Sequence, residues 1–184
     1  MGVQLIFVVE TNKKCNSDWI YIKDTIEHFY SYDRTQLKLS AVYMDGKGNY
    51  RSKKKEREIN SLISQYSITS KNNRSIVLYC FDFELFLVID YDSNVADLNF
   101  LEEARRYCSE QCYEFIWFCK DVEQVYLGKR INDSQKKKES ANFKEKKIII
   151  NINVKQLSKE KYGIGTSNIM NILDRCPGLV RKIS

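Results

Sequence analysis

The sequence has little of several features, and each shortage argues against a class of protein. One proline and seven glycines in 184 residues argue against long unstructured linkers, so a single domain is expected. No apolar run approaches the roughly 18 residues that span a bilayer. The apolar segment 2–9 lacks the basic start and small-residue cleavage site of a signal peptide, and Glu10 follows it at once. These shortages predict a cytoplasmic protein without a membrane segment.

Common catalytic patterns are also missing. The only histidine, His28, lies within a predicted amphipathic helix, which argues against a Ser-His-Asp triad. The glycine patterns that cradle nucleotide phosphates are absent. The six cysteines are expected to be thiols in a reducing compartment. Cys108, Cys112 and Cys119 with His28 offer a zinc alternative, but their spacing is not that of a zinc ribbon, and packing as small hydrophobes is favoured.

Four apolar runs stand out against this background. Their near-continuous hydrophobicity is typical of strands buried on both faces, and they occupy residues 3–9, 37–44, 75–81 and 113–119. Helical patterns separate them, at residues 18–30, 52–65 and 97–110, and a short helix is expected at 121–127. This alternation predicts an α/β fold, with a mostly parallel central sheet and helices on both faces.

The last third of the chain is basic. Residues 130–161 hold ten Lys or Arg and four Asp or Glu, a local charge of +6 that equals the net charge of the chain. We predict an α/β core over 1–130 and an extension over 131–184, with a basic helix at 134–147, a strand at 148–154 and a final helix at 168–174. The lysines predicted to contact nucleic-acid phosphates are Lys136, Lys137, Lys138, Lys144, Lys146 and Lys147.

Acidic residues gather where the predicted strands end. Glu10, Asp45 and Asp82 directly follow strands, and Asp121 comes just after the fourth. Asp is common in turns, so each alone is weak evidence, but parallel strands would bring all of them to the edge where ligands bind. Residues 82–103 carry seven acids and no Lys or Arg. A solvated loop tolerates such repulsion, and so does a site where a divalent cation relieves it.

Three motifs give this pattern a family resemblance. They are VVETN at 8–12, YCFD at 79–82 followed by IDYDSN at 89–94, and FIWFCKDVEQVYLG at 115–128. Their order resembles the Toprim fold, in particular the RloB-like Toprim proteins of bacterial mobile and defence loci. The resemblance covers residues 1–130.

The resemblance implies a Mg²⁺ site in which a glutamate acts as general acid/base or ligand and an Asp-x-Asp pair holds the metal. Glu10 matches the first position. For the second, Asp82 and Glu84 stand at the strand end but form only Asp-x-Glu, whereas Asp90 and Asp92 form Asp-x-Asp after an extra apolar run. The implied catalytic residues are therefore Glu10, Asp82, Asp90 and Asp92. The implied metal ligands are Asp82, Glu84, Asp90 and Asp92.

Three functions follow as expectations. The first is a Mg²⁺-dependent nuclease, or another phosphodiester-acting protein, that binds RNA or DNA in phage defence or a mobile element. The second is a non-catalytic nucleic-acid-binding or assembly protein on a Toprim-like scaffold, with an ATPase partner protein, which the irregular Asp-x-Asp register favours. The third is a basic α/β protein whose lysines only form a solvated surface. Whether the protein is an enzyme stays open at this point.

Overall fold

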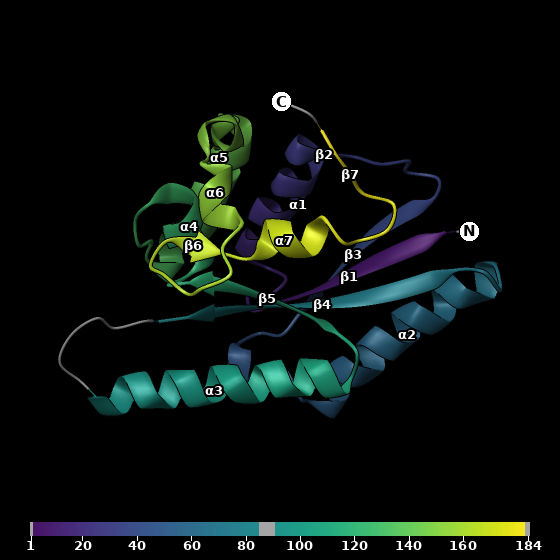
Figure 1. The fold of residues 1–184 in the computed structure, drawn as a ribbon, viewed down its shortest axis with the longest axis horizontal. Helices are drawn as coiled ribbons and strands as arrows, with labels where there is room; N and C mark the ends of the chain where they lie inside the picture. Colours follow the sequence, from purple (N-terminus) through teal and green to yellow (C-terminus); the bar gives the residue numbers. More distant parts are fainter. Residues whose placement is uncertain (1, 85–90, 183–184) are drawn as a thin grey trace.

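A central sheet organises the fold (Figure 1). The structure, a computed structural model, describes residues 2–84 and 91–182, with only the backbone over 91–97. Within these residues the sheet has five strands in the order β3-β1-β4-β5-β6. Their bounds are β1 Val3–Val9, β3 Leu37–Tyr43, β4 Arg74–Phe83, β5 Glu114–Cys119 and β6 Thr166–Ser167. All neighbours pair in parallel except β5 and β6, so the predicted mostly parallel sheet is confirmed.

The register brings the strand ends together. Val9 pairs with Tyr43, so β1 and β3 end side by side. On the other side of β1, Val8 pairs with Tyr79, and β4 continues alongside β5 as far as Phe83. The carboxyl ends of these strands therefore share one edge of the sheet, which is the ligand-binding edge of such folds.

Helices cover both faces, as predicted (Figure 1). One face carries α1 Ser17–Phe29, α4 Val122–Leu127, α5 Asp133–Glu145, α6 Val154–Leu157 and α7 Ile169–Leu173. The other carries α2 Lys53–Thr69 and α3 Tyr91–Glu110. Alternate strand residues divide between them, since Phe7 and Cys80 belong to the first core, and Val8 and Phe81 to the second. Short elements complete the chain: η1 Lys47–Asn49, η2 Ile148–Asn151, and an antiparallel pair of β2 Tyr30–Ser31 and β7 Val180–Arg181.

Capping residues mark one end of α2 and both ends of α4. Ser52 caps α2 by accepting a hydrogen bond from the Lys55 amide. Asp121 caps α4 in the same way, accepting from the Gln124 amide at 2.6 Å. Gly128 ends α4 with φ 67°, a left-handed conformation that glycine adopts readily.

The predicted strand at 148–154 is wrong. The segment forms η2 and leads into α6, with Ile149 and Leu157 buried in the core while Ile150 is 61% exposed. Isoleucine favours strands, but tertiary packing overrides that preference here, because the segment packs against α1 and α5 and not along an edge of the sheet.

Two predicted helix starts also need correction. The backbone of α3 begins at Tyr91, so Asp97 lies inside the helix and does not cap it. Asp18 does not cap α1, which begins at Ser17; its buried carboxylate instead accepts hydrogen bonds within the preceding loop and from Ser17. The extra apolar run predicted before residue 90 falls largely on 85–90, outside the described residues.

The C-terminal segment shares the main hydrophobic core. Phe143 of α5 is fully buried between Tyr21 and Tyr126, at ring-centroid distances of 4.7 and 5.6 Å. Leu157 and Met170 are buried in the same cluster. This packing holds α5 against α1 and thereby fixes the start of α5 over the carboxyl edge of the sheet. Among the described residues no helix is long and apolar enough to cross a membrane.

Candidate functional site

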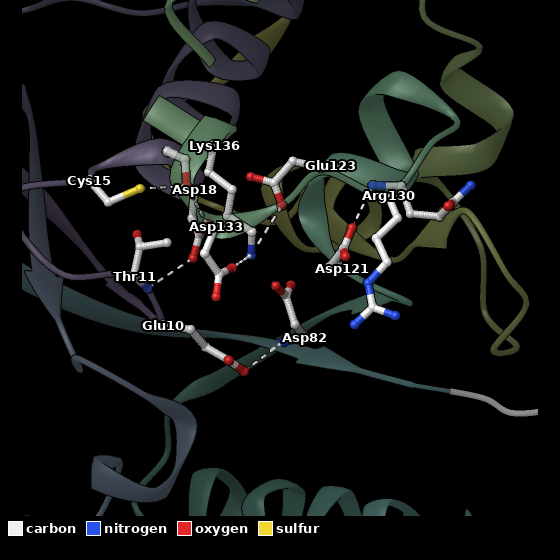
Figure 2. A network of polar contacts seen from close by, with 12 residues as sticks. Glu10, Thr11, Cys15, Asp18, Asp82, Asp121, Glu123, Arg130, Asp133 and Lys136 are labelled. Carbon is white, nitrogen blue, oxygen red and sulfur yellow. Dashed lines mark hydrogen bonds and ion pairs between the residues drawn. The ribbon is translucent and has the colours of Figure 1, made fainter. Parts of the chain in front are cut away.

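A polar cleft lies at the carboxyl edge of the sheet (Figure 2). Its volume is about 470 Å³. The loops after β1 and β3 and the end of β4 form one side, and the starts of α1 and α5 form the other. The charged residues that line it are Glu10, Asp18, Asp45, Asp82, Asp133 and Lys136. The cleft is therefore strongly acidic in a chain whose net charge is +6.

Glu10 and Asp82 form the floor of this cleft. Glu10 follows β1 directly, and Asp82 is the second-last residue of β4. The Asp82 amide donates a 2.8 Å hydrogen bond to Glu10 Oε1. Both side chains are half-buried. The Glu10 carboxylate thus lies against the backbone of the neighbouring strand, while the Asp82 carboxylate turns away from this hydrogen bond, toward α4 in Figure 2.

Asp18 closes the cleft behind the β1–α1 loop. It is buried in the first turn of α1 and accepts hydrogen bonds from the Thr11 amide at 3.1 Å and from the Ser17 hydroxyl at 3.3 Å. The hydrogen bond from the Thr11 amide fixes the path of the chain immediately after Glu10. Asp18 therefore adds a buried negative charge and holds the loop that carries the first carboxylate.

Glu123 and Lys136 form the roof. Glu123, in the first turn of α4, is fully buried. Lys136, in the first turn of α5, is 19% exposed, and its Nζ lies 3.6 Å from Glu123 Oε2 and 3.4 Å from Asp133 Oδ1. Among the residues that the structure describes, neither Glu123 oxygen has a hydrogen-bond partner. The Glu123 carboxylate instead forms an ion pair with the Lys136 ammonium group.

Burial and mutual repulsion raise the pKa of every buried acid here. Burial raises the pKa of Glu10 to about 8, although the Asp82 amide opposes this. Burial and then repulsion from Glu10 and Asp18 hold the pKa of Asp82 well above its ordinary value. Burial likewise raises the pKa of Asp18, and that of Glu123 to about 7. These buried acids therefore keep their protons to higher pH than free carboxyl groups do.

Lys136 responds in the opposite sense. Burial alone would lower the pKa of Lys136, but the carboxylates of Glu123, Asp82 and Asp18 outweigh burial and raise that pKa above its ordinary value. Lys136 in turn lowers the pKa of Glu10 and Glu123. The ammonium group is thus charged at neutral pH and belongs electrostatically to the acidic cluster.

The donor chemistry fits a hard divalent cation. Among the described residues no set of three or more His, Cys, Asp or Glu side chains is already arranged around one point as a metal would require. Mg²⁺, however, keeps several waters and takes one or two carboxylates, which Glu10 and Asp82 supply. The zinc alternative is not supported, because Cys108 and Cys119 are buried in different clusters and Cys112 is exposed.

The structure separates the predicted acids. Glu10, Asp45 and Asp82 line the cleft together. Asp121 instead caps α4, and its negative charge contributes to the raised pKa of Asp82. Glu84 instead lies 3.5 Å from Arg130, measured from Oε1 to Nη2. Asp90 falls outside the described residues. Asp92 lies within α3, where only the backbone is described.

The predicted lysines divide as well. Lys136 points into the cleft and pairs with Glu123 and Asp133, so its ammonium group is half-buried and not on the open surface. The remaining members are exposed: Lys137, Lys138, Lys144, Lys146 and Lys147. Sequence reasoning missed three acids of the site, namely Asp18, Asp133 and Glu123. Only Asp18 gave a signal, as a polar residue at a helix start, and that signal indicated a cap.

Known proteins do not extend this description. No family model, curated protein or solved structure matches the chain.

Proposed function

We propose that this protein is a Mg²⁺-dependent enzyme of the Toprim type that acts on phosphodiester bonds of nucleic acid, with Glu10 and Asp82 at its centre. One observation carries the proposal: the 2.8 Å hydrogen bond that places the Glu10 carboxylate against the Asp82 amide. It joins Glu10, which follows β1, to the neighbouring parallel strand β4 at the ligand-binding edge of the sheet, where Asp82 also lines the cleft.

The residues divide the chemistry between them. When bound, Mg²⁺ would neutralise phosphate charge and stabilise the leaving oxygen. Asp82, with its carboxylate turned into the cleft, supplies an oxygen ligand. Glu10, with a pKa of about 8, exchanges a proton close to neutral pH, which suits a general acid or base. Asp18 holds the loop after Glu10 through the Thr11 amide and so keeps the general acid/base in place.

Exposed lysines of α5 would hold the nucleic acid. Lys136 reaches into the cleft from the first turn of α5, and the exposed Lys137 and Lys138 follow it in the same helix. Lys144 lies near the far end of the same helix, and Lys146 follows it. Contacts of this kind bind phosphates without reading sequence, and they weaken as salt rises. The proposal therefore expects cleavage with little sequence preference.

The proposal assigns fewer acidic metal ligands than the family resemblance implies. Because Glu84 lies against Arg130, Asp82 is assigned as the ligand without it. Asp90 and Asp92 stay predictions, since the described residues do not place their side chains. The defence or mobile-element setting and the ATPase partner, which only the resemblance implies, also stay predictions.

The test is cleavage of single- and double-stranded DNA and RNA in Mg²⁺ and in EDTA. Glu10→Gln and Asp82→Asn are expected to abolish Mg²⁺-dependent cleavage while the far-ultraviolet circular dichroism spectrum is unchanged. Glu58→Gln is the matched control, because Glu58 pairs with Lys55 on the surface of α2. Cleavage that continues in Glu10→Gln, or that needs no metal, would overturn the proposal.

A non-catalytic nucleic-acid-binding or assembly protein is the second candidate. The observation that favours it is that no three-residue metal group is already assembled among the described residues. This candidate predicts salt-sensitive binding of nucleic acid with no cleavage in Mg²⁺ or Mn²⁺, and equal binding by the wild type and Glu10→Gln.

A further inference from the structure

We propose that Lys136 occupies the second cation position of a two-cation centre, so that the protein binds one divalent ion and uses a fixed ammonium group in place of another. The inference rests on the proposed function for the first position, which Glu10 and Asp82 form. It adds a residue from α5, a helix of the basic segment, to the acidic centre of the sheet.

The environment of the Glu123 carboxylate indicates that a cation belongs beside it. Its side chain is fully buried, and among the described residues both of its oxygens lack hydrogen-bond donors. A buried carboxylate without donors is costly, and proteins keep one where a cation sits. The group nearest to it is the Lys136 ammonium, with Nζ 3.6 Å from Oε2. That distance is ion pairing, longer than a normal hydrogen bond.

Asp82 links the two positions. Its amide contacts Glu10 at the first position, and its carboxylate turns toward Glu123 and the roof of the cleft in Figure 2. Asp82 and Asp18 are also among the acids whose charge acts on Lys136. Two-metal phosphodiester sites hold ions about 3.5–4 Å apart around shared carboxylates. Here one shared carboxylate faces a metal position on one side and an ammonium group on the other.

Lysine suits this place. Its ammonium group is a compact point charge with three donors, so it can pair with acids and still contact a phosphate oxygen. It comes from the first turn of α5, and the burial of Phe143 holds that helix against α1. The charge is therefore positioned before substrate arrives, as electrostatic stabilisation of a transition state requires.

The direct test is the number of Mn²⁺ ions bound without substrate, measured by isothermal titration calorimetry. We expect one ion for the wild type and for Lys136→Arg, and two for Lys136→Met, where the vacated position becomes available to metal. Adding Glu123→Gln to Lys136→Met should return the number to one. Lys54→Met, an exposed lysine of α2, is the control and should bind one ion.

The outcomes separate the two proposals. One ion for both the wild type and Lys136→Met overturns the role of Lys136 and leaves the metal site intact. No ion bound by the wild type overturns the first position, and the present inference with it. One ion for the wild type and two for Lys136→Met, without cleavage of any nucleic acid, supports the two-cation centre while the proposed enzymatic function fails.

A second measurement uses the wild type, in case Lys136→Met does not fold. The ammonium signal of Lys136, assigned by its absence from Lys136→Arg, is followed by nitrogen-15 nuclear magnetic resonance during Mg²⁺ titration. If ion and ammonium group occupy adjacent positions, the signal shifts and remains protected at saturation. Release of the signal to the position of a solvent-exposed lysine would show that the metal displaces Lys136, and the inference would be wrong.

Discussion

Replacing Glu10 by glutamine should stabilise the metal-free protein at alkaline pH, although it removes the central acid of the site. Burial raises the pKa of Glu10 from 4.5 to about 8. A carboxyl group whose pKa is raised by folding favours the folded state below its unfolded pKa, and that advantage disappears as pH rises through the folded pKa. Wild-type stability should therefore fall between pH 4.5 and about 8.

The size of the effect follows from the same values. The rise of the Glu10 pKa from 4.5 to about 8 corresponds to about 5 kcal/mol, at about 1.36 kcal/mol per pKa unit. Because Glu10 is half-buried, water screens part of this, and we expect roughly 2–3 kcal/mol. For a chain of this length that difference moves the melting temperature by about 5–10 °C. Glutamine keeps an oxygen that can accept from the Asp82 amide, so the hydrogen bond at this position is preserved.

The assay is thermal unfolding followed by circular dichroism in EDTA. Wild type and Glu10→Gln should melt together at about pH 4, below both pKa values, and the variant should melt higher at about pH 9. Mg²⁺ at tenfold its dissociation constant should then stabilise the wild type by about 1.4 kcal/mol and leave the variant nearly unchanged. Glu58→Gln serves as the control and should show neither effect. A variant that melts below the wild type at alkaline pH in EDTA would refute the electrostatic reasoning.

Three further predictions concern binding and stability. The first changes three exposed lysines of α5 to glutamate, namely Lys137, Lys138 and Lys144. Retention of the protein on a polyanion column should be abolished and its salt dependence flattened. Unchanged retention would favour the solvated-surface interpretation of these lysines. Phe143→Ala should lower the free energy of unfolding, measured in urea, by about 3–5 kcal/mol, because it empties the contact that holds α5. Asn168→Ala should cost about 1–3 kcal/mol in the same assay, since its side chain hydrogen-bonds the Phe115 carbonyl and the Trp117 amide at the edge of β5. A loss below about 0.5 kcal/mol for either alanine variant would contradict its assigned contact.

The sheet was predictable because its signal is local. A parallel strand buried on both faces needs apolar residues at almost every position, and six of the seven residues of β1 meet that requirement, with Gln4 the exception. Once the strands are parallel, geometry alone brings the residues after their ends together. This is why Glu10, Asp45 and Asp82 could be placed at one cleft from the sequence.

The helical details were less predictable because packing decides them. Residues 148–154 carry four isoleucines and a valine, a composition that favours a strand in isolation. The core accepts Ile149 and Leu157 and leaves Ile150 outside, in a segment that packs against α1 and α5 and not beside a strand of the sheet. For α3 the sequence offers an acidic cap candidate both at Asp90, directly before the start at Tyr91, and at Asp97, and no local signal decides between them.

The roof of the site was the part least predictable from the sequence. Asp18, Glu123 and Lys136 stand at the starts of three helices, one near the beginning of the chain and two in succession after β5, where charged residues are ordinary. What makes them a site is that α1, α4 and α5 begin over the same edge of the sheet, and that arrangement follows from the packing of α5 on α1. A lysine within a basic run predicts a solvated phosphate contact. The structure turns the same ammonium group inward, where a buried glutamate with no hydrogen-bond donor among the described residues requires a cation.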